Sequence, residues 1–278
     1  MMIELLFLVL VWGRLVNCDD YAKELPKNIF ILAGQSNMAG RGGVIDGIWD
    51  GIIPPECKPN PFIFRFTAKL TWEEAREPLH KDIDLNKTCG IGPGMAFANS
   101  VLYRDPSIGR VGLVPCAIGG TNISQWARGT DLYNQLIWRT KAALKRGGII
   151  RALLWYQGES DTKSYDDAKC YKSNLERFFT NVRADLGSPI LPVFQVALAS
   201  GEGPYIEIVR EAQLGIELPD VRCVDAKGLL LQPDGLHLSA QAEASLEMDK
   251  LHLRKLVFET KTSPKSDLYQ LDTTQIQN

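Results

Sequence analysis

The feature that most restricts the fold of this chain is an alternation of short apolar runs with longer amphipathic segments. The apolar runs are rich in β-branched residues and have the length of strands; they cover residues 29–33, 62–66, 111–116, 149–156, 191–198 and 221–224. The segments between them repeat apolar residues at helical spacing; they cover residues 93–103, 131–146, 165–186 and 205–218. Strands that alternate with helices pair in parallel, so the sequence predicts an α/β fold: a three-layer α/β/α sandwich with a central parallel sheet and helices on both faces.

Two long connections and a last helix complete this outline. Residues 39–57 and 67–92 are long connecting segments, the first rich in glycine and proline, and loops of that length on an α/β body usually carry function. A final helix is expected at residues 239–257, with Ser239 as its N-cap.

The composition narrows the classes of partner. The 278 residues include 31 basic and 33 acidic side chains, which gives a formal net charge of -2. Because no basic excess exists to attract phosphate backbones or anionic lipid, we expect neither a nucleic-acid partner nor stable membrane insertion. The sequence contains no CxxC pair and no His/Cys cluster, so we expect no metal site and no cofactor.

The first eighteen residues have the character of a targeting segment. Residues 5–12 form an apolar run that is too short for a bilayer span, which takes roughly 20 apolar residues. Small or tolerated residues then precede Asp19, as at a signal-peptidase site. We therefore expect a signal peptide at residues 1–18, one domain at 19–260, a flexible tail at 261–278, and a secreted, extracellular protein. The alternative is an apolar N-terminus docked on the domain.

Secretion bears on the cysteines and on two glycosylation sequons. Five cysteines follow residue 18, so at least one thiol stays free. Cys57 and Cys89 lie in loop-rich sequence and are the disulfide candidates, although spacing does not fix connectivity. Asn86 and Asn122 begin sequons for N-glycosylation, and the second lies beside residues expected to line a pocket.

A candidate nucleophile, Ser36, follows the first expected strand in the sequence GQSNMAG at residues 34–40. Ligands of parallel sheets bind at the carboxyl ends of the strands, and the flanking glycines permit a tight turn that exposes the hydroxyl. The pattern is not the GxSxG turn of α/β-hydrolases. Taken alone, a serine between a strand and a helix is most often an N-cap.

A base for such a serine is available in the sequence DGLH at residues 234–237. His237 has a side chain that accepts a proton near neutral pH, and Asp234 is close enough in sequence to orient its ring. The other two histidines are weaker candidates. His252 lies in a segment rich in Lys and Arg, and His80 has only Asp82 as an acidic neighbour.

Two further loops that follow expected strands offer hydrogen-bond donors for an oxyanion. Gly119 and Gly120 provide backbone N–H groups, and Gln157 provides a carboxamide. Together with the N–H of Ser36, these groups form a candidate oxyanion hole. Separately, the Gly-Gly pair is also a common turn, and Gln157 could equally bridge two loops.

These blocks in this order resemble the SGNH/GDSL hydrolase superfamily, and within it the sialate O-acetylesterase-like carbohydrate esterases, especially their plant members. The motifs that carry the resemblance are GQSNMAGRGG at 34–43, GIGPGMAFAN at 90–99, PCAIGGTNISQW at 115–126, WYQGESD at 155–161 and DGLHLS at 234–239. They span nearly the whole chain after residue 18. The subgroup has Gln-Gly where the wider superfamily has Asn, and GQSN where it has GDS.

The resemblance implies a flavodoxin-like SGNH fold and a serine esterase. Ser36 would be the nucleophile, His237 the base and Asp234 its acid partner, with the Ser36 N–H, Gly119 and Gln157 as oxyanion donors. Gly120 is a secondary candidate. The implied substrate is an acetylated carbohydrate such as a cell-wall polysaccharide, and a plant protein of this kind would lie in the apoplast or cell wall.

Several alternatives remain open at this point. Glu159 competes with Asp234 as the acid partner, although from the residues alone a salt-bridged structural role for Glu159 and Asp161 is the stronger reading. The chain could instead be a secreted carbohydrate-binding protein with a degenerate esterase site, or a lipase or thioesterase that acts on longer acyl chains. The sequence fixes neither the polysaccharide nor the oligomeric state. Four aromatic residues near these loops are candidates to stack on sugar rings or to pack in the core: Trp49, Trp72, Trp126 and Tyr156.

Overall fold

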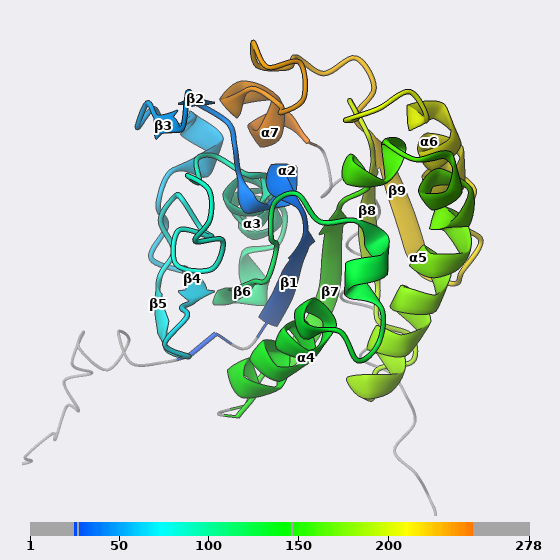
Figure 1. Cartoon of the computed structure of the whole chain (residues 1–278). Helices are drawn as coiled ribbons and strands as arrows, with labels where there is room; N and C mark the ends of the chain where they lie inside the picture. The colour runs from blue at the N-terminus through cyan, green and yellow to red at the C-terminus, as the bar shows by residue number, and fades with distance from the viewer. Residues whose placement is uncertain (1–24, 27, 146, 247–278) are drawn as a thin grey trace, which may run out of the picture.

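Seven strands form the central sheet of the protein in a computed structural model that describes residues 25–26, 28–145 and 147–246 (Figure 1). The strands are β1 (Asn28–Gly34), β4 (Ile63–Phe66), β5 (Trp72–Glu74), β6 (Val111–Pro115), β7 (Ile149–Tyr156), β8 (Val193–Ala197) and β9 (Val221–Asp225). They lie in the order β5-β4-β6-β1-β7-β8-β9, and all neighbours are parallel except β4 and β5. The predicted α/β fold is confirmed, with an antiparallel edge strand in a stretch that we expected to be a loop.

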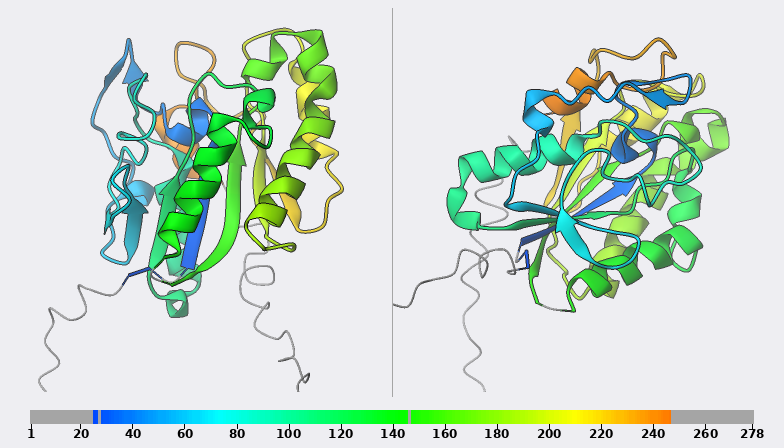
Figure 2. Two further views of the ribbon diagram at one scale, coloured as in Figure 1. Left: turned by 60° about the horizontal axis from the view of Figure 1, so that its bottom comes forward. Right: turned by 90° about the vertical axis from the view of Figure 1, so that its left-hand side faces the viewer.

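Helices cover both faces of the sheet, as predicted (Figures 1 and 2). The main helices are α3 (Pro93–Arg104), α4 (Asp131–Ala143), α5 (Tyr165–Asp185) and α6 (Ile206–Leu214). Phe97 of α3 packs on Phe30 of β1, with ring centroids 5.0 Å apart. Phe178 of α5 packs on Trp155 of β7 at 4.5 Å. Phe30 and Trp155 point to opposite faces because Phe30 pairs with Ala152, and side chains alternate along a strand.

The ends of the helices differ from the sequence expectation by a few residues. The helix α4 ends three residues before 146, and α6 ends four residues before 218, at a glycine. The helix α7 (Ala240–Ser245) begins after Ser239, whose hydroxyl accepts a hydrogen bond from the N–H of Ala242 at 3.2 Å, so the predicted N-cap is confirmed. The part of this expected helix beyond residue 246 lies outside the described residues.

The connections between the main strands and helices contain short elements that the sequence pattern did not predict. The turn after β1 forms α2 (Ser36–Ala39), and a hairpin of β2 (Val44–Ile45) and β3 (Ile48–Trp49) follows it. Single 3₁₀ turns lie at η1 (Pro55–Cys57), η2 (Pro106–Ile108), η3 (Ile123–Trp126) and η4 (Ser160–Thr162).

Within the described ranges, no helix combines the length and the apolar character needed to cross a bilayer. The expected signal peptide at 1–18 and the expected tail at 261–278 lie outside these ranges, as does His252.

The five cysteines of the described residues are all free thiols, so Cys57 and Cys89, the disulfide candidates, are not bonded to each other. The two thiols are buried in different surroundings. Cys57 belongs to the apolar core, whereas the Cys89 sulfur lies 3.6 Å from a guanidinium nitrogen of Arg41. Burial raises the pKa of Cys89 to about 11, so this side chain stays a neutral thiol at neutral pH.

The parallel strands end at one edge of the sheet, and the close packing of their ends depends on Gly34. This residue ends β1 with a φ of +134°, and a Cβ there would lie 2.0 Å from the carbonyl oxygen of Tyr156 at the end of β7. The turn that carries Ser36 therefore starts where only glycine fits.

We expect Gly34→Ala to lower Tm by about 6–12 °C, or to prevent soluble folding, because the backbone clash adds to the strain of a positive φ. Thermal unfolding followed by far-UV circular dichroism measures this change. Gly187→Ala is the control, since Gly187 also has a positive φ of +62° but open space at the Cβ position. A Gly34→Ala variant that is as stable as the Gly187→Ala variant would contradict the close approach of β1 and β7.

Candidate active site

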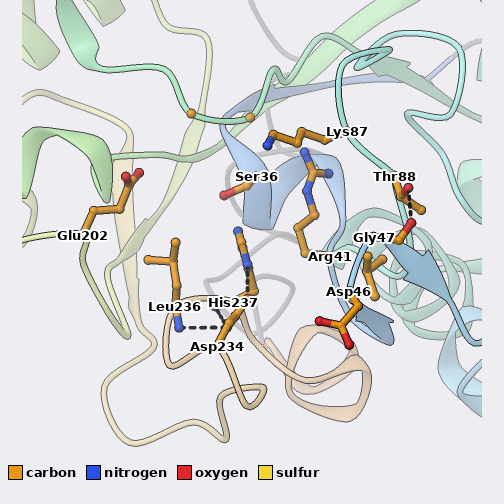
Figure 3. Close-up of a pocket in the computed structure, with 13 residues that line it drawn as sticks. Ser36, Arg41, Asp46, Gly47, Lys87, Thr88, Glu202, Asp234, Leu236 and His237 are labelled. Carbon is orange, nitrogen blue, oxygen red and sulfur yellow. Dashed lines mark hydrogen bonds and ion pairs between the residues drawn. The ribbon is translucent and has the colours of Figure 1, made fainter.

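Loops at the carboxyl edge of the sheet surround a cavity of about 410 Å³ (Figure 3). The cavity is lined by Ser36, Arg41, Val44, Asp46, Gly47, Lys87, Thr88, Gly119, Gly120, Glu202, Asp234, Leu236 and His237. These residues come from the turn after β1, the hairpin β2–β3, and the loops after β5, β6, β8 and β9. Five of the seven candidate site residues therefore share one cavity, whereas Gln157 and Glu159 do not line it.

The Asp234–His237 pair is held within one tight loop. The Asp234 Oδ2 lies 2.6 Å from the Nδ1 of His237, and Asp234 Oδ1 accepts hydrogen bonds from the backbone N–H groups of Leu236 and His237 at 2.9 and 3.0 Å. Although partial burial opposes it, these hydrogen bonds lower the pKa of Asp234 below its usual value. An ionised Asp234 fixes the tautomer with the proton on Nδ1 and leaves Nε2 of His237 free.

Ser36 is buried, with 5% of its surface exposed, and it is the first residue of α2. The N-cap of α2 is Gln35, so the interpretation of Ser36 as a simple N-cap is wrong. Figure 3 shows the His237 ring pointing toward Ser36 across the cavity. The hydrogen bonds among the described residues do not include one between these two side chains, and such contacts are often long before substrate binds.

Buried side chains tie the His237 loop to the turn that carries Ser36. Asn37 Oδ1 accepts a hydrogen bond from the backbone N–H of Leu238 at 3.0 Å. Gln232 donates from Nε2 to the carbonyl of Arg41 at 2.7 Å and accepts from the N–H of Gly43 at 3.1 Å. These bonds bring together segments that are about two hundred residues apart in the chain.

Gln157, which we expected to be an oxyanion donor, is fully buried and does not line the cavity. Its amide nitrogen lies 2.5 Å from the Asp161 carboxylate, 2.9 Å from the Thr121 carbonyl and 3.2 Å from Gln35 Oε1. Its amide oxygen accepts from the Tyr171 hydroxyl at 3.1 Å. Both N–H groups are therefore engaged, and the carboxamide bridges two loops, which is the alternative that the sequence left open.

Gly119 lies against Ser36, but its backbone N–H already donates a hydrogen bond to a carboxylate. A Cβ at Gly119 would lie 3.5 Å from the Ser36 Cβ and 2.5 Å from the Arg41 guanidinium, so a side chain at this position would displace that guanidinium. The Gly119 N–H donates to Asp84 Oδ2 at 3.1 Å, and Asp84 also forms a buried ion pair with Arg41. Among the described residues, no hydrogen bond uses the backbone N–H of Ser36 or of Gly120.

Arg41 and Asp84 are functional-site residues that the sequence patterns did not predict. Arg41 stands inside the GQSNMAGRGG motif, so its position in that motif was the available signal. Asp84 lies in a long loop without a motif, and only the fold brings it under Gly119.

Glu159 is fully buried and contacts Asn37 rather than His237. Glu159 Oε1 accepts a hydrogen bond from Asn37 Nδ2 at 2.6 Å, while Oε2 has no protein partner among the described residues. Burial raises the pKa of Glu159 to about 7, and burial likewise raises the pKa of Asp161 to about 7. Asp161 accepts from the N–H of Ile123 at 3.0 Å. The expected salt bridges are wrong, because among the described residues both carboxyl groups have neutral partners.

Metal-binding and histidine candidates elsewhere lack the geometry of a site. Across the ranges that the structure covers, no group of three or more His, Cys, Asp or Glu side chains is placed to hold a metal ion. His80 is 1% exposed and does not line the cavity, and burial lowers its pKa to about 3. Asp82, its acidic neighbour in sequence, pairs instead with Arg65 at 2.6 Å.

The four aromatic candidates for sugar stacking do not line the cavity. Trp126 and Tyr156 are fully buried, and Trp126 packs on Trp155 with ring centroids 5.3 Å apart. Trp72 packs on Phe66 at 4.9 Å. Core packing, the alternative reading, applies to these three side chains, and Trp49 packs against the same core.

Comparison with known proteins gives a family. A family model described as carbohydrate esterase, sialic acid-specific acetylesterase, matches residues 26–251. A probable carbohydrate esterase from Arabidopsis thaliana is 56% identical over 228 residues, which cover 80% of this chain and 87% of the relative.

Solved structures agree with this match. The crystal structure of an Arabidopsis thaliana protein superposes with a TM-score of 0.81 at 53% identity, covering 83% of this chain and 99% of that one. NanS has a TM-score of 0.65 at 17% identity, covering 84% and 98%. A carbohydrate acetylesterase from Xanthomonas citri has a TM-score of 0.59 at 18% identity, covering 83% and 57%. The last two likenesses concern the fold alone.

Glu243 on α7 is another fully buried carboxyl group, close enough to Glu159 and Glu77 to interact with their charges. Neither of its oxygens has a protein partner among the described residues. Burial raises the pKa of Glu243 well above the usual glutamate value, and the carboxyls of Glu159 and Glu77 raise it further. Glu243 therefore stays protonated in the folded protein over a pH range in which the same carboxyl group is ionised in the unfolded chain.

We expect Glu243→Gln to stabilise the protein increasingly as the pH rises above about 5. A carboxyl whose pKa is raised on folding contributes full stability below its unfolded pKa and loses that contribution as the pH rises toward the folded pKa. Urea unfolding at pH 5 and pH 8 measures the difference from wild type. Glu211→Gln, at an exposed position, is the control and should leave the pH dependence unchanged. Equal effects of Glu243→Gln at both pH values would contradict a protonated Glu243.

Proposed function

Because the chain belongs to the sialic acid-specific acetylesterase family of carbohydrate esterases and is a carboxylic ester hydrolase, we propose that it removes O-linked acetyl groups from carbohydrate with Ser36, His237 and Asp234 as a catalytic triad. The observation that carries this proposal is the 2.6 Å contact between Asp234 and His237, in a loop whose imidazole points into the cavity of Ser36. A buried serine, an oriented imidazole and an ionised acid are the parts that acyl transfer requires.

The proposed reaction has two halves. In the first, the Ser36 oxygen attacks the acetyl carbonyl carbon while Nε2 of His237 takes the hydroxyl proton. His237 then gives that proton to the departing sugar oxygen, which leaves an acetyl group on Ser36. In the second half, water attacks the acetyl-enzyme with His237 as the base, acetate leaves, and the Ser36 hydroxyl is restored. Asp234 stabilises the imidazolium that forms in each half.

The geometry favours backbone N–H groups, rather than the Gln157 side chain, as hydrogen-bond donors to the oxyanion. The Ser36 N–H is the first donor, because it lies next to the attacking oxygen and is not engaged elsewhere among the described residues. Gly120 lines the cavity and offers a second N–H, while Gly119 would have to share its N–H between the oxyanion and Asp84. Gln157 supports the loops from below.

The cavity wall suits a hydroxylated substrate better than a long acyl chain. Arg41 and Lys87 supply positive charge, whereas Asp46 and Glu202 supply negative charge on the same wall. Such groups hydrogen-bond to sugar hydroxyls, whereas an extended acyl tail would remove them from water without offering hydrogen-bond partners. This observation favours carbohydrate acetyl esters over the lipase and thioesterase alternatives.

We expect Ser36→Ala to lower kcat for release of acetate by at least about 10⁴-fold, because no other group supplies the nucleophile. The measurement is acetate release from p-nitrophenyl acetate and from a panel of acetylated polysaccharides such as xylan and pectin. Ser173→Ala, an exposed serine on α5, is the control and should retain full activity.

Three outcomes would contradict parts of this proposal. Full turnover by a folded Ser36→Ala variant would remove Ser36 from the mechanism. Retention of polysaccharide by the wild type without release of acetate would favour a binding protein. A preference for long acyl chains in a series of p-nitrophenyl esters would favour a lipase or thioesterase.

We also propose that the protein is secreted after removal of residues 1–18, with Asn86 glycosylated. Asn86 is exposed in a loop, and its sequon hydroxyl, on Thr88, donates to the Gly47 carbonyl at 2.5 Å beside the cavity. In the second sequon, Ser124 donates to Asn122 Oδ1 at 3.0 Å, and that side chain caps η3. Asn86 is therefore the more accessible acceptor.

Expression in a eukaryotic secretory host should give a secreted protein that begins at Asp19. N-terminal sequencing checks the cleavage site, and a mass loss on glycosidase treatment that disappears in Asn86→Gln checks the glycan. Asn122→Gln is the control and should keep the mass loss. Secretion of a chain that retains Met1 would contradict the cleavage after residue 18. A mass loss that persists in Asn86→Gln would contradict the glycan on Asn86.

A further inference from the structure

The residue after the proposed nucleophile, Asn37, joins three separate segments of the chain. Asn37 is fully buried. Its Nδ2 donates to Glu159 Oε1 at 2.6 Å, in the loop after β7, and its Oδ1 accepts from the N–H of Leu238 at 3.0 Å. The amide thus has a donor contact on one side and an acceptor contact on the other.

The chemistry of the two partners fixes the orientation of this amide. An ionised Glu159 only accepts hydrogen bonds, so the Nδ2 of Asn37 faces it. The backbone N–H of Leu238 only donates, so Oδ1 faces Leu238. A rotation of the amide by 180° would place oxygen against oxygen and nitrogen against N–H, which costs both hydrogen bonds inside a buried site.

The contact at Leu238 determines where the neighbouring imidazole lies. Leu238 is fully buried and follows His237 directly, whereas the side chain of His237 is 19% exposed. The position of the imidazole ring is therefore set by the backbone of His237 and by the hydrogen bond to Asp234. The backbone of His237 is in turn held, through Leu238, by a side chain attached to the residue next to Ser36.

We propose that Asn37 and Glu159 are a positioning pair: Glu159 orients the Asn37 amide, and this amide holds the His237 loop against Ser36. The inference rests on the proposed esterase function. It assigns Glu159 a role that acts through Asn37, in place of a role as the acid partner of His237. A displacement of about 1 Å between a base and a nucleophile can cost about 10²-fold in rate, which sets the size of the expected effect.

The test reverses the polarity of the hydrogen bond. In Asn37→Asp, two carboxylates face each other at pH 8.5, and we expect kcat to fall by about 10²-fold with little change in KM. In Glu159→Gln, the amide oxygen still accepts from Asn37, so kcat should stay within about threefold of wild type, while Glu159→Ala should resemble Asn37→Asp.

The double variant Asn37→Asp with Glu159→Gln should recover most of the lost kcat. The introduced amide can donate to one carboxylate oxygen, and the other oxygen can accept from the N–H of Leu238. Asn134→Asp, at an exposed position on α4, is the control for the substitution itself. Tm and the final extent of Ser36 labelling by a fluorophosphonate measure the folded, competent fraction in every variant.

The outcomes separate the inference from the function on which it rests. Loss of activity in Glu159→Gln that the double variant does not recover would identify Glu159 as the acid partner and overturn the inference. A lower Tm in Asn37→Asp with kcat unchanged would show a purely structural role and also overturn it. A wild-type protein that neither releases acetate nor is labelled at Ser36 would instead refute the proposed function.

Discussion

The cavity depends on hydrogen bonds that buried side chains make between loops distant in sequence. Ser36 follows the first strand, whereas His237 follows the last, and the two belong to no common element. Asn37 binds the N–H of Leu238, and Gln232 binds the backbone of Arg41 and Gly43. Among the described residues, no backbone–backbone hydrogen bond joins these two segments, so amide side chains, which donate and accept at once, supply the connection. Removal of such a partner leaves an unpaired polar group in the interior.

Buried polar residues near the cavity are connected to one another by hydrogen bonds. Gln157 is engaged by Asp161 and Tyr171, and Asp84 binds both Arg41 and the N–H of Gly119. Buried polar groups are tolerated where they have partners, and a well-connected network is rigid. The free-energy cost of this burial falls on the carboxyl groups, because burial disfavours their charged form. Burial raises the pKa values of Glu159 and Asp161 to about 7, so the interior under the cavity changes its protonation near neutral pH.

The sequence was informative wherever a short-range pattern carried the signal. The period of the apolar residues located all six expected strands, and the Ser239 cap was correct because capping depends on neighbours only three residues away. The antiparallel β5 was missed because three residues, two of them glutamates, give no apolar period. Gln157 was expected in the cavity because a carboxamide at the end of a strand has the same sequence whether it points toward a ligand or beneath it. Trp126 belongs to the motif at residues 115–126 but packs in the core.

By itself, the sequence determined the α/β architecture, the edge of the sheet at which the functional loops gather, and the local pairing of Asp234 with His237. Each of these follows from periodicity or from contacts within one turn. Only the tertiary structure decided that Glu159 contacts Asn37, that Asp84 takes the N–H of Gly119, and that Cys57 and Cys89 stay apart. The reason is physical: the direction of a polar side chain is set by whichever partner satisfies its hydrogen bonds, and the partners of Asp84 and Glu159 lie 35 and 122 residues away in the chain.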